Sequence, residues 1–363
     1  MKKLLILLLC AAAPAQAQVA VKGQVVHTMD GPAIADGVVV VTDGRIAAVG
    51  PAAGVAIPAG YRVLEAAVVT PGLIDAHGTV GLSGIYNVPA DQDMLDKGGP
   101  IQPELRAVDA YNPDDELVAW VRSFGVTTVH TGHAPGVPVS GQTMIVKTRG
   151  ATVGEAVVRD AVAVAATLTP PDSRWGGDGP SPPSRAKTVA MLRQELIRAR
   201  EYQAKHAAFD GEGAPPARDL RAETMVRVLD GELALMVTAH KVHDITNALR
   251  LADEFGIRLW LDGAAEAHQL LPQIKAAGVP VLVHPTMARA FGAAENLSLT
   301  TAAQLAEAGI PFALQSGYES YVPKTRVVLF EAAVAASHDL GYDRALAAVT
   351  RDAAVLLGIA DRV

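Results

Sequence analysis

Apolar residues in the first part of the chain occur in short runs separated by polar turns. Between residues 18 and 70 these runs are rich in valine and isoleucine, which favour strands. Asp43-Gly44 separates two of the runs, and this dipeptide is typical of a two-residue hairpin. The pattern predicts a small β-domain with strands at Gln24–Val26, Gly37–Val41, Arg45–Val49 and Arg62–Leu64.

From about Val68 the pattern changes, because short apolar runs now alternate with amphipathic helical stretches. One such stretch has Asp244 where a helix could be capped and Gly256 where it could end. Repeated strand and helix patterns indicate a parallel sheet covered by helices, and about eight strands favour a closed (β/α)8 barrel of the TIM type. The predicted barrel strands begin at Leu73-Ile74-Asp75 and continue with Gly125–Val129, Thr143–Val146, Val162–Ala165, Leu233–Thr238, Ile257–Leu261, Val279–Val283 and Pro311–Leu314.

The middle of the chain interrupts this alternation. Thr169–Arg185 and Gly211–Arg218 are dense in proline, glycine, serine or charged residues, which is typical of loops. Thr188–Phe209 between them has the pattern of one long, highly charged helix. We therefore expect an insertion at about 169–218 over one face of the barrel.

Composition narrows the classes of protein that the chain can belong to. Of its 363 residues, 50% are hydrophobic and 19% charged, which excludes disorder for most of the length. The formal net charge is −7, and no basic run follows the first residues, so nucleic-acid binding is not expected. No later segment is apolar enough to cross a membrane. We expect a small-molecule substrate, and a homo-oligomer stays open.

The N-terminus has the features of a signal peptide. Lys2 and Lys3 precede the apolar run Leu4–Ala13, and Ala15-Gln16-Ala17 provides a small-x-small cleavage pattern. The alternative is a buried N-terminal helix. Cleavage after residue 17 would remove Cys10, the only cysteine, so that the mature chain has neither a disulfide nor a thiolate ligand. It would also leave 29 basic and 38 acidic residues, and we expect the protein to be exported to the periplasm.

The stretch from residue 69 to residue 79, Val-Thr-Pro-Gly-Leu-Ile-Asp-Ala-His-Gly-Thr, carries the most specific chemical signal. It resembles the signature of the amidohydrolase superfamily, in which a strand ending Pro-Gly-Leu-Ile-Asp is followed by His-x-His. Alternate residues at a strand end point the same way, so both histidines can reach a metal at the barrel mouth. His77 matches the first histidine, whereas Thr79 replaces the second. The metal-binding motif is therefore degenerate.

The resemblance extends over most of the chain, from about residue 20 to the C-terminus. Asp43–Gly50 resembles the hairpin that precedes the barrel, Gly125–Val129 the second barrel strand, and Ala347–Gly358 the last barrel helix. The imidazolonepropionase-like subgroup is the most similar part of the family. Its members continue with strands that complete the small β-domain, so we expect an incomplete, truncated β-sandwich here. The implied division is a signal peptide at 1–17, a β-domain at 18–70 and the barrel at 71–363.

The resemblance implies a divalent metal, with one zinc ion favoured over two, although an empty site is an alternative. His77 and His240 are the implied imidazole ligands, and the alternative for His240 is a capping or buried histidine. Lys147, at a strand end, is implied as a further ligand, against the alternative of an exposed lysine. Gln315-Ser316-Gly317 stands where the family has a strand-eight aspartate.

Without that aspartate, the general base would be another residue at the mouth. His284 and Asp75 are the candidates. His130 and His133 also follow a predicted strand and would face the same mouth.

A polar segment after the first barrel strand, residues 91–113, is expected to form a loop over the mouth. Glu104, Arg106 and Asp109 in this loop would contact substrate or form a structural ion network.

Three functions are compatible with these observations. The first is hydrolysis of a C–N bond in a non-peptide amide, a cyclic amide or an amidine, by a metal-activated water. The second is a metal-dependent dipeptidase on the same scaffold. The third is a catalytically silent barrel that binds a small molecule or a partner, because fold alone does not determine function.

Overall fold

A computed structural model describes residues 18–86, 88–169, 184–284, 290, 292–318 and 327–363. Contacts between Cα atoms divide the chain into two compact units, Met1–Pro71 and Gly72–Val363. The predicted signal peptide and most of the loop predicted at 169–185 lie outside the described residues. None of the helices in the described ranges is both long enough and apolar enough to span a membrane.

The first unit is a four-stranded sheet with the strand order β3-β2-β1-β4. β1 pairs antiparallel with β2 and parallel with β4. The predicted hairpin is confirmed, because Thr42 pairs with Arg45 across a turn in which Asp43 and Gly44 have φ values of 51° and 74°. The strands are β1 (Val19–Val26), β2 (Ile34–Thr42), β3 (Arg45–Pro51) and β4 (Arg62–Val69).

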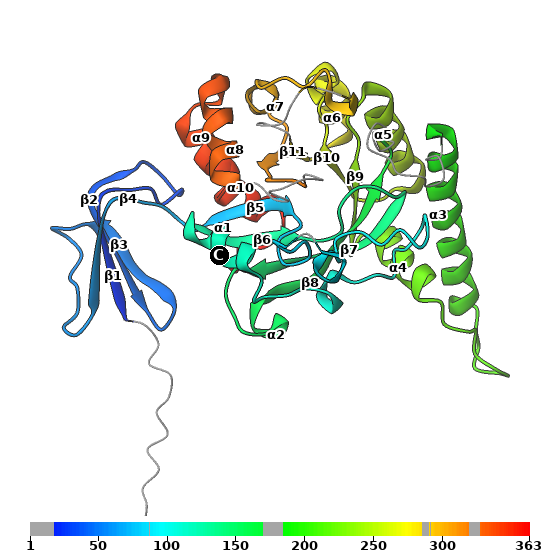
Figure 1. Cartoon of the computed structure of the whole chain (residues 1–363), viewed down its shortest axis with the longest axis horizontal. Coiled ribbons are helices and arrows are strands. Elements are labelled where there is room, and N and C mark those ends of the chain that lie inside the picture. Colours follow the sequence, from blue (N-terminus) through cyan, green and yellow to red (C-terminus); the bar gives the residue numbers. More distant parts are fainter. Residues whose placement is uncertain (1–17, 87, 170–183, 285–289, 291, 319–326) are drawn as a thin grey trace, which may run out of the picture. The chain divides into compact units, whose positions relative to one another are not determined.

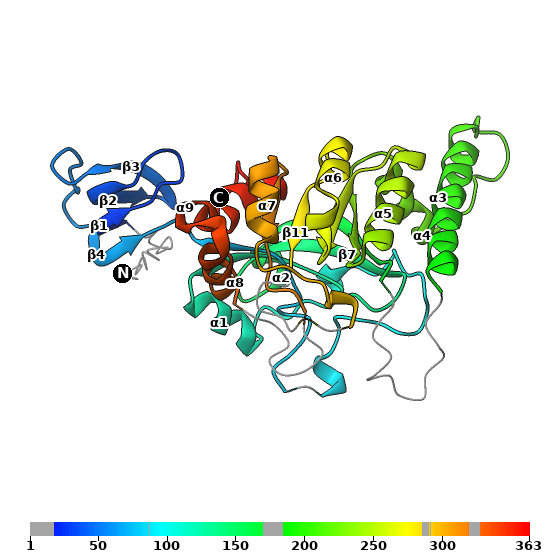
Figure 2. The ribbon, with the colours of Figure 1, turned by 90° about the horizontal axis from the view of Figure 1, so that it is seen from above.

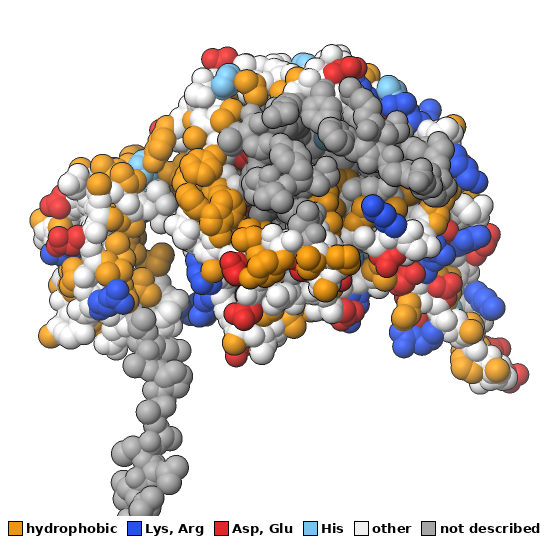
Figure 3. Space-filling view, viewed as in Figure 1, with side chains coloured by type: hydrophobic (Ala, Val, Ile, Leu, Met, Phe, Trp, Pro, Cys, Tyr) orange, Lys and Arg blue, Asp and Glu red, His pale blue; other side chains and the backbone are white. Residues whose placement is uncertain are grey.

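The core of this sheet is small. Ala20, Val38 and Val40 are buried, whereas β3 and β4 are exposed along almost their whole length. Apolar side chains therefore remain on the surface of the outer strands, where Figure 3 shows them gathered. They are Ile46, Val49, Val63, Leu64 and Val68. Within the described residues the unit is one sheet with a three-residue buried cluster, as expected for an incomplete sandwich.

The second unit is built on an eight-stranded sheet that curves into a nearly closed barrel (Figure 1). Strands that are neighbours in the sheet are also consecutive in the chain. A parallel bridge between Gly78 and Gly317 joins the first strand to the segment after the last. The strands are β5 (Leu73–Gly78), β6 (Val126–Thr131), β7 (Val139–Lys147), β8 (Val157–Thr167), β9 (Ala234–Thr238), β10 (Leu259–Gly263), β11 (Val281–Val283) and β12 (Phe312–Leu314).

The predicted α/β barrel is confirmed, but one strand runs against the others. β7 pairs antiparallel with both β6 and β8, whereas every other neighbouring pair is parallel. Only a short loop separates β6 from β7, which is what an antiparallel connection allows. The expectation of a uniformly parallel sheet is therefore wrong for β7. The carboxyl end of β7 lies beside the amino ends of β6 and β8.

Helices cover the outside of the parallel part of the sheet. In Figure 2, α3, α5, α6 and α7 stand in a row along one face, and neighbouring members of this row are in contact. The long helix predicted in the insertion is α3. The helices are α1 (Glu116–Ser123), α2 (Val153–Ala156), α3 (Arg185–Ala207), α4 (Leu220–Leu229), α5 (Val242–Phe255), α6 (Leu271–Ala277), α7 (Thr301–Ala308), α8 (Val328–Ala335), α9 (Tyr342–Ala348) and α10 (Arg351–Leu356).

The N-terminus of α5 differs from the prediction. The helix begins at Val242 with Lys241 as its N-cap, so Asp244 lies inside the first turn and is not the capping residue. Asp244 is buried, accepts a hydrogen bond from the Thr169 hydroxyl at 3.0 Å and pairs with Arg185 at 2.8 Å. Its carboxylate therefore joins α5 to the segments before it. The predicted end is confirmed, because Gly256 has a φ of 67°.

The interior of the barrel is apolar below the carboxyl ends of its parallel strands. Ile74, Met236, Trp260 and Leu282 belong to one buried cluster, which also contains residues of α10. Alternate residues of a strand point to the same face, so the residues two positions further along these strands also face inward. This alternation places the candidate site at the carboxyl ends of the parallel strands.

Candidate active site

Polar side chains replace the apolar interior at the carboxyl ends of four neighbouring strands. Each follows a buried apolar interior residue by two positions, so the same alternation that forms the core aims them at the mouth. They are Thr238 after Met236 on β9, Asp262 after Trp260 on β10, His284 after Leu282 on β11 and Gln315 after Ala313 on β12. The mouth of this barrel is therefore a continuous polar layer above an apolar one.

His77 joins this layer from β5. The pairing of β5 with β6 shifts between Asp75 and Gly78, so the strand is irregular in the stretch that contains His77. Nδ1 of His77 lies 2.9 Å from Oδ1 of Asp262. Both side chains are buried, with 3% and 5% of their surface exposed. A buried acid and a buried imidazole thus share a hydrogen bond across the barrel.

Two further donors hold the Asp262 carboxylate in place. Gln315 donates its Nε2–H to Oδ1 at 2.7 Å, and the Thr238 hydroxyl donates to Oδ2 at 2.5 Å. Burial alone would raise the pKa of Asp262, but the attraction of His77 and these hydrogen bonds outweigh burial, and its pKa lies well below the usual range. Asp262 is therefore a fixed, ionised carboxylate.

The charge of Asp262 acts in turn on His77. Burial disfavours the imidazolium, but the Asp262 carboxylate outweighs burial and raises the pKa of His77 above its ordinary value of 6.5. Because a carboxylate only accepts, Nδ1 of His77 must carry the proton in the shared hydrogen bond. Nε2 of His77 is buried and has no hydrogen-bond partner among the described residues. This atom is free to bind a proton or a ligand.

His130, whose ring centroid lies 5.5 Å from that of His77, is occupied differently. Its Nδ1 donates to the carbonyl of Ala76 at 2.7 Å, so its Nε2 accepts from the Thr143 hydroxyl at 2.7 Å. Burial, together with repulsion by His77, lowers the pKa of His130 to about 3. His130 is therefore a neutral residue whose two ring nitrogens are both used in packing the mouth.

Asp75, one of the predicted general bases, joins the first strand to the last. Its Oδ1 accepts from the backbone amide of Ser316 at 2.9 Å, and its Oδ2 accepts from the Ser316 hydroxyl. Burial raises the pKa of Asp75 to about 6, although the hydrogen bonds from Ser316 oppose that shift. Both oxygens are committed to closing the barrel, so Asp75 serves as a positioning residue and not as a free base.

The other predicted histidines lie at the same mouth. His240 follows β9, its Nδ1 is buried without a hydrogen-bond partner, and burial lowers its pKa. His284 follows β11, and its ring packs against Gly317, where an added Cβ would lie 2.7 Å from Nε2. Gly317 also has a φ of 67°, so its lack of a side chain serves both the turn and the histidine.

Lys147 lies at the other end of the barrel. It pairs with Thr128 near the start of β6 and donates to the Thr128 hydroxyl at 2.9 Å. Because β7 runs antiparallel, its carboxyl end faces away from the mouth that holds His77. The structure therefore does not bring Lys147 together with His77, and the direction of β7 is the reason.

Comparison with known structures identifies this architecture. An amidohydrolase from Thermotoga maritima MSB8 superposes with a TM-score of 0.86 over 95% of this chain and 90% of that chain, at 24% sequence identity. The chain therefore has the same fold as this amidohydrolase. At the level of the fold, this confirms the resemblance inferred from Pro71–Thr79. A Xaa-Pro dipeptidase with bound methionine has a TM-score of 0.52 over 95% of this chain and 90% of that chain, at 14% identity.

Sequence comparison gives weaker similarities to the amidohydrolases. Amidohydrolase tasK from Hapsidospora irregularis is 24% identical over 337 residues. The match covers 81% of this chain but spans only 32% of that relative's length. No protein-family model matches the chain.

An amidohydrolase fold implies a metal at the mouth, and the described residues do not supply a full ligand set. His77 Nε2 and His240 Nδ1 are buried without partners, so two imidazole nitrogens are present. Thr79 and Gln315 offer a hydroxyl and an amide where the family has stronger ligands. No group of three or more His, Cys, Asp or Glu side chains that could hold a metal occurs in the part of the chain described. Since zinc sites use at least three protein ligands, the residues present do not form a complete zinc site.

Asp262 is the residue that sequence reasoning missed. It stands at the end of the apolar run predicted at 257–261, and its position at a barrel strand end was the available signal. Its pairing with His77 could not be read from the sequence, because the two residues meet only when the barrel closes.

Proposed function

We propose that this chain is a hydrolase of C–N bonds in non-peptide amides, cyclic amides or amidines, with His77 as its general base. The observation that supports this most strongly is the buried Asp262–His77 pair, which leaves Nε2 of His77 without a partner at the barrel mouth. An imidazole oriented by a fixed carboxylate is a common means of activating a nucleophile.

Water and the substrate are the only reactants in the proposed reaction. Nε2 of His77 takes a proton from a water molecule, whose oxygen forms a bond to the carbon of the amide or amidine. The C–N bond then breaks, and the imidazolium returns its proton to the leaving nitrogen. The Asp262 carboxylate stabilises the imidazolium between these two proton transfers. Gln315 and Thr238 act through Asp262 as positioning residues, because each donates a hydrogen bond to its carboxylate.

A second candidate function is binding without catalysis. The incomplete ligand set, in which Thr79 and Gln315 replace the family's ligands, favours a catalytically silent barrel that holds a small molecule at its mouth. This alternative predicts a bound ligand that is recovered unchanged.

A hydrolysis screen separates the candidates. The purified protein would be offered cyclic amides, amidines, small amides and dipeptides, beside the His77→Asn variant. His243→Asn is the matched control, because His243 lies on α5 with 55% of its side chain exposed. We expect turnover of a non-peptide substrate that His77→Asn abolishes and His243→Asn retains. Turnover of dipeptides alone would favour a dipeptidase, and binding without turnover would favour the silent barrel.

The predicted zinc ion would activate the water in place of His77, and this is the alternative to the general-base route. Of the ligands predicted for this ion, His77 and His240 each have a buried ring nitrogen without a hydrogen-bond partner in the described part of the chain. These atoms are Nε2 of His77 and Nδ1 of His240. Metal analysis of the purified protein, with activity measured before and after chelation, decides between the two routes. Activity that persists at substoichiometric metal supports the general-base route. Loss on chelation and recovery with zinc would contradict it.

We also propose that the protein acts after export, since Lys2, Lys3 and the apolar run Leu4–Ala13 precede a cleavage pattern at Ala15-Gln16-Ala17. Cell fractionation and N-terminal sequencing test this location. A mature chain that starts at Gln18 and is recovered from the periplasm is the expected result. An uncleaved chain would count against it.

A further inference from the structure

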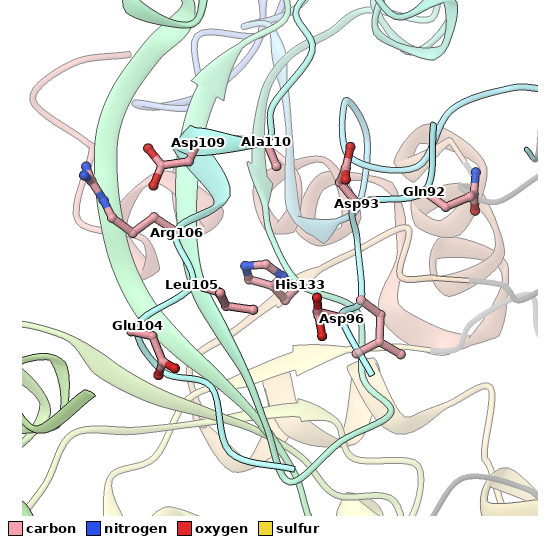
Figure 4. Close-up of a pocket in the computed structure, with 10 residues that line it drawn as sticks. Gln92, Asp93, Asp96, Glu104, Leu105, Arg106, Asp109, Ala110 and His133 are labelled. Atoms are coloured by element: carbon pink, nitrogen blue, oxygen red, sulfur yellow. The ribbon is translucent and has the colours of Figure 1, made fainter. Parts of the chain in front are cut away.

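A polar cavity lies in the segments that follow β5 and β6. It has a volume of about 340 Å³ and is bounded by residues 92–110 together with His133. Figure 4 shows Asp93 and Asp96 on one side of the His133 ring, and Glu104, Arg106 and Asp109 on the other. We call this cavity the acidic pocket.

The charges in the acidic pocket are unequal. Four carboxylates line it, from Asp93, Asp96, Glu104 and Asp109. Arg106 is the one cationic lysine or arginine among the lining residues, and it pairs at 3.5 Å with Asp160, which does not line the pocket. The pocket therefore carries an excess of negative charge that its own residues do not neutralise.

His133 is the more informative residue of the pocket. Its side chain is buried, with 4% of the residue exposed, and neither ring nitrogen has a hydrogen-bond partner among the described residues. Burial lowers the pKa of His133, although the carbonyls of Leu105 and Met94 lie close enough to oppose that shift. A buried polar ring without partners costs about 1–3 kcal/mol unless something else bonds to it.

Glu104 also has a buried polar atom without a hydrogen-bond partner. Its Oε2 is buried and has no hydrogen-bond partner in the described part of the chain. An acceptor without a donor and an imidazole without a partner therefore face one cavity. A ligand with several N–H groups would satisfy Oε2 of Glu104 and the acceptor nitrogen of a neutral His133.

We propose that the acidic pocket binds an organic cation that carries N–H donors, of the guanidinium or primary ammonium class. A guanidinium presents five N–H donors in a planar fork that matches carboxylates, and a primary ammonium presents three. The volume of the pocket lies within the range of small-molecule sites.

Two other cations fit the pocket less well. A metal ion needs several ligands within a short distance, and the described residues bring no such group of three together. A quaternary ammonium is recognised by aromatic rings, and the lining residues include none of Phe, Tyr or Trp. A cation that donates hydrogen bonds remains.

Calorimetric titration of the full mature protein tests this inference. The probes are N-acetyl-arginine amide, N-acetyl-lysine amide and N-acetyl-citrulline amide, which retains the shape of the arginine probe without its charge. We expect at least one cationic probe to bind at least ten times more tightly than the citrulline probe. The affinity should fall as salt is added. The arginine and lysine arms distinguish guanidinium from ammonium.

Variants then locate the binding. Glu104→Gln and Asp93→Asn should each weaken the cationic probe about tenfold, which corresponds to about 1.4 kcal/mol. Asp253→Asn on α5, an exposed carboxylate outside the pocket, should leave the affinity unchanged. Thermal melting verifies that each variant is folded. Equal binding of the citrulline and arginine probes, or unchanged affinity in folded Glu104→Gln and Asp93→Asn, would overturn the inference.

The inference is independent of the proposed catalysis. Binding is measured without turnover, and the His77→Asn variant should bind the cationic probe as the wild type does. A protein that binds the probe but hydrolyses nothing would refute the proposed function alone. A protein that hydrolyses a neutral amide but binds no cation would refute the acidic pocket alone.

Discussion

Asp262 and His77 share a hydrogen bond of 2.9 Å although 185 positions separate them in the chain. The bond joins β10 to β5 across the mouth of the barrel. It makes Asp262 a fixed anion and His77 a stronger base than an isolated imidazole.

Replacing Asp262 by Asn should abolish most of the activity. The amide keeps the size of the side chain but removes the charge that stabilises the His77 imidazolium, so we expect turnover to fall by about 10²–10⁴-fold. Steady-state kinetics measures this fall. Asp253→Asn, an exposed change on α5, is the control. Near-normal kcat in a folded Asp262→Asn protein would show that the pair does not take part in catalysis.

Activity should rise with pH over a range set by His77. The base must lose its proton, and the Asp262 carboxylate raises the pKa of His77 above 6.5. The acidic limb of the kcat/KM profile is therefore expected above that value. In Asp262→Asn the limb should move to lower pH, because the raising charge is gone. A limb that stays in place would assign the titration to another group.

Asp75 should make stability depend on pH. Its pKa is about 6 in the folded protein against an ordinary 3.8, so folding favours the protonated form. The associated stabilisation is present below about pH 3.8 and is lost as pH rises through about 6, at most about 3 kcal/mol. Urea unfolding of wild type and Asp75→Asn across this range measures it. Their difference in unfolding free energy should change with pH, and a constant difference would contradict the argument.

Two leucines differ in burial and give a matched test of the core. Leu235 on β9 has 1% of its surface exposed, and Leu220 at the start of α4 has 61%. Leu235→Ala should cost about 2–5 kcal/mol of unfolding free energy, because it leaves a cavity in the packed barrel. Leu220→Ala should change it by about 0.5 kcal/mol or less. Equal costs in urea melts would mean that β9 is not packed as described.

Lys147 should be dispensable for catalysis. It lies at the end of the barrel opposite the mouth and bonds to Thr128, so Lys147→Met should leave kcat and KM within about twofold of the wild type. His77→Asn, measured in parallel, should abolish turnover. A large catalytic loss in a folded Lys147→Met protein would restore the prediction that Lys147 belongs to the active site.

Much of the fold was predictable because its signals are local. Alternation of apolar residues identified the barrel strands, Asp43-Gly44 identified the hairpin, and Gly256 identified the end of α5. These features depend on the preferences of a few neighbouring residues, which a sequence displays directly. The start of α5 was not predicted correctly, because the carboxylate of Asp244 bonds to Thr169 and Arg185 and does not cap the helix.

The sequence by itself determined the barrel class, the position of His77 at a strand end and the loss of the second motif histidine at Thr79. Only the tertiary structure decided that β7 is antiparallel, which places Lys147 far from the mouth, and that Asp262 is the partner of His77. Strand direction and contacts across a barrel depend on how distant segments pair. Asp75 and Ser316, 241 positions apart, are joined for the same reason, since barrel closure brings the first strand beside the last.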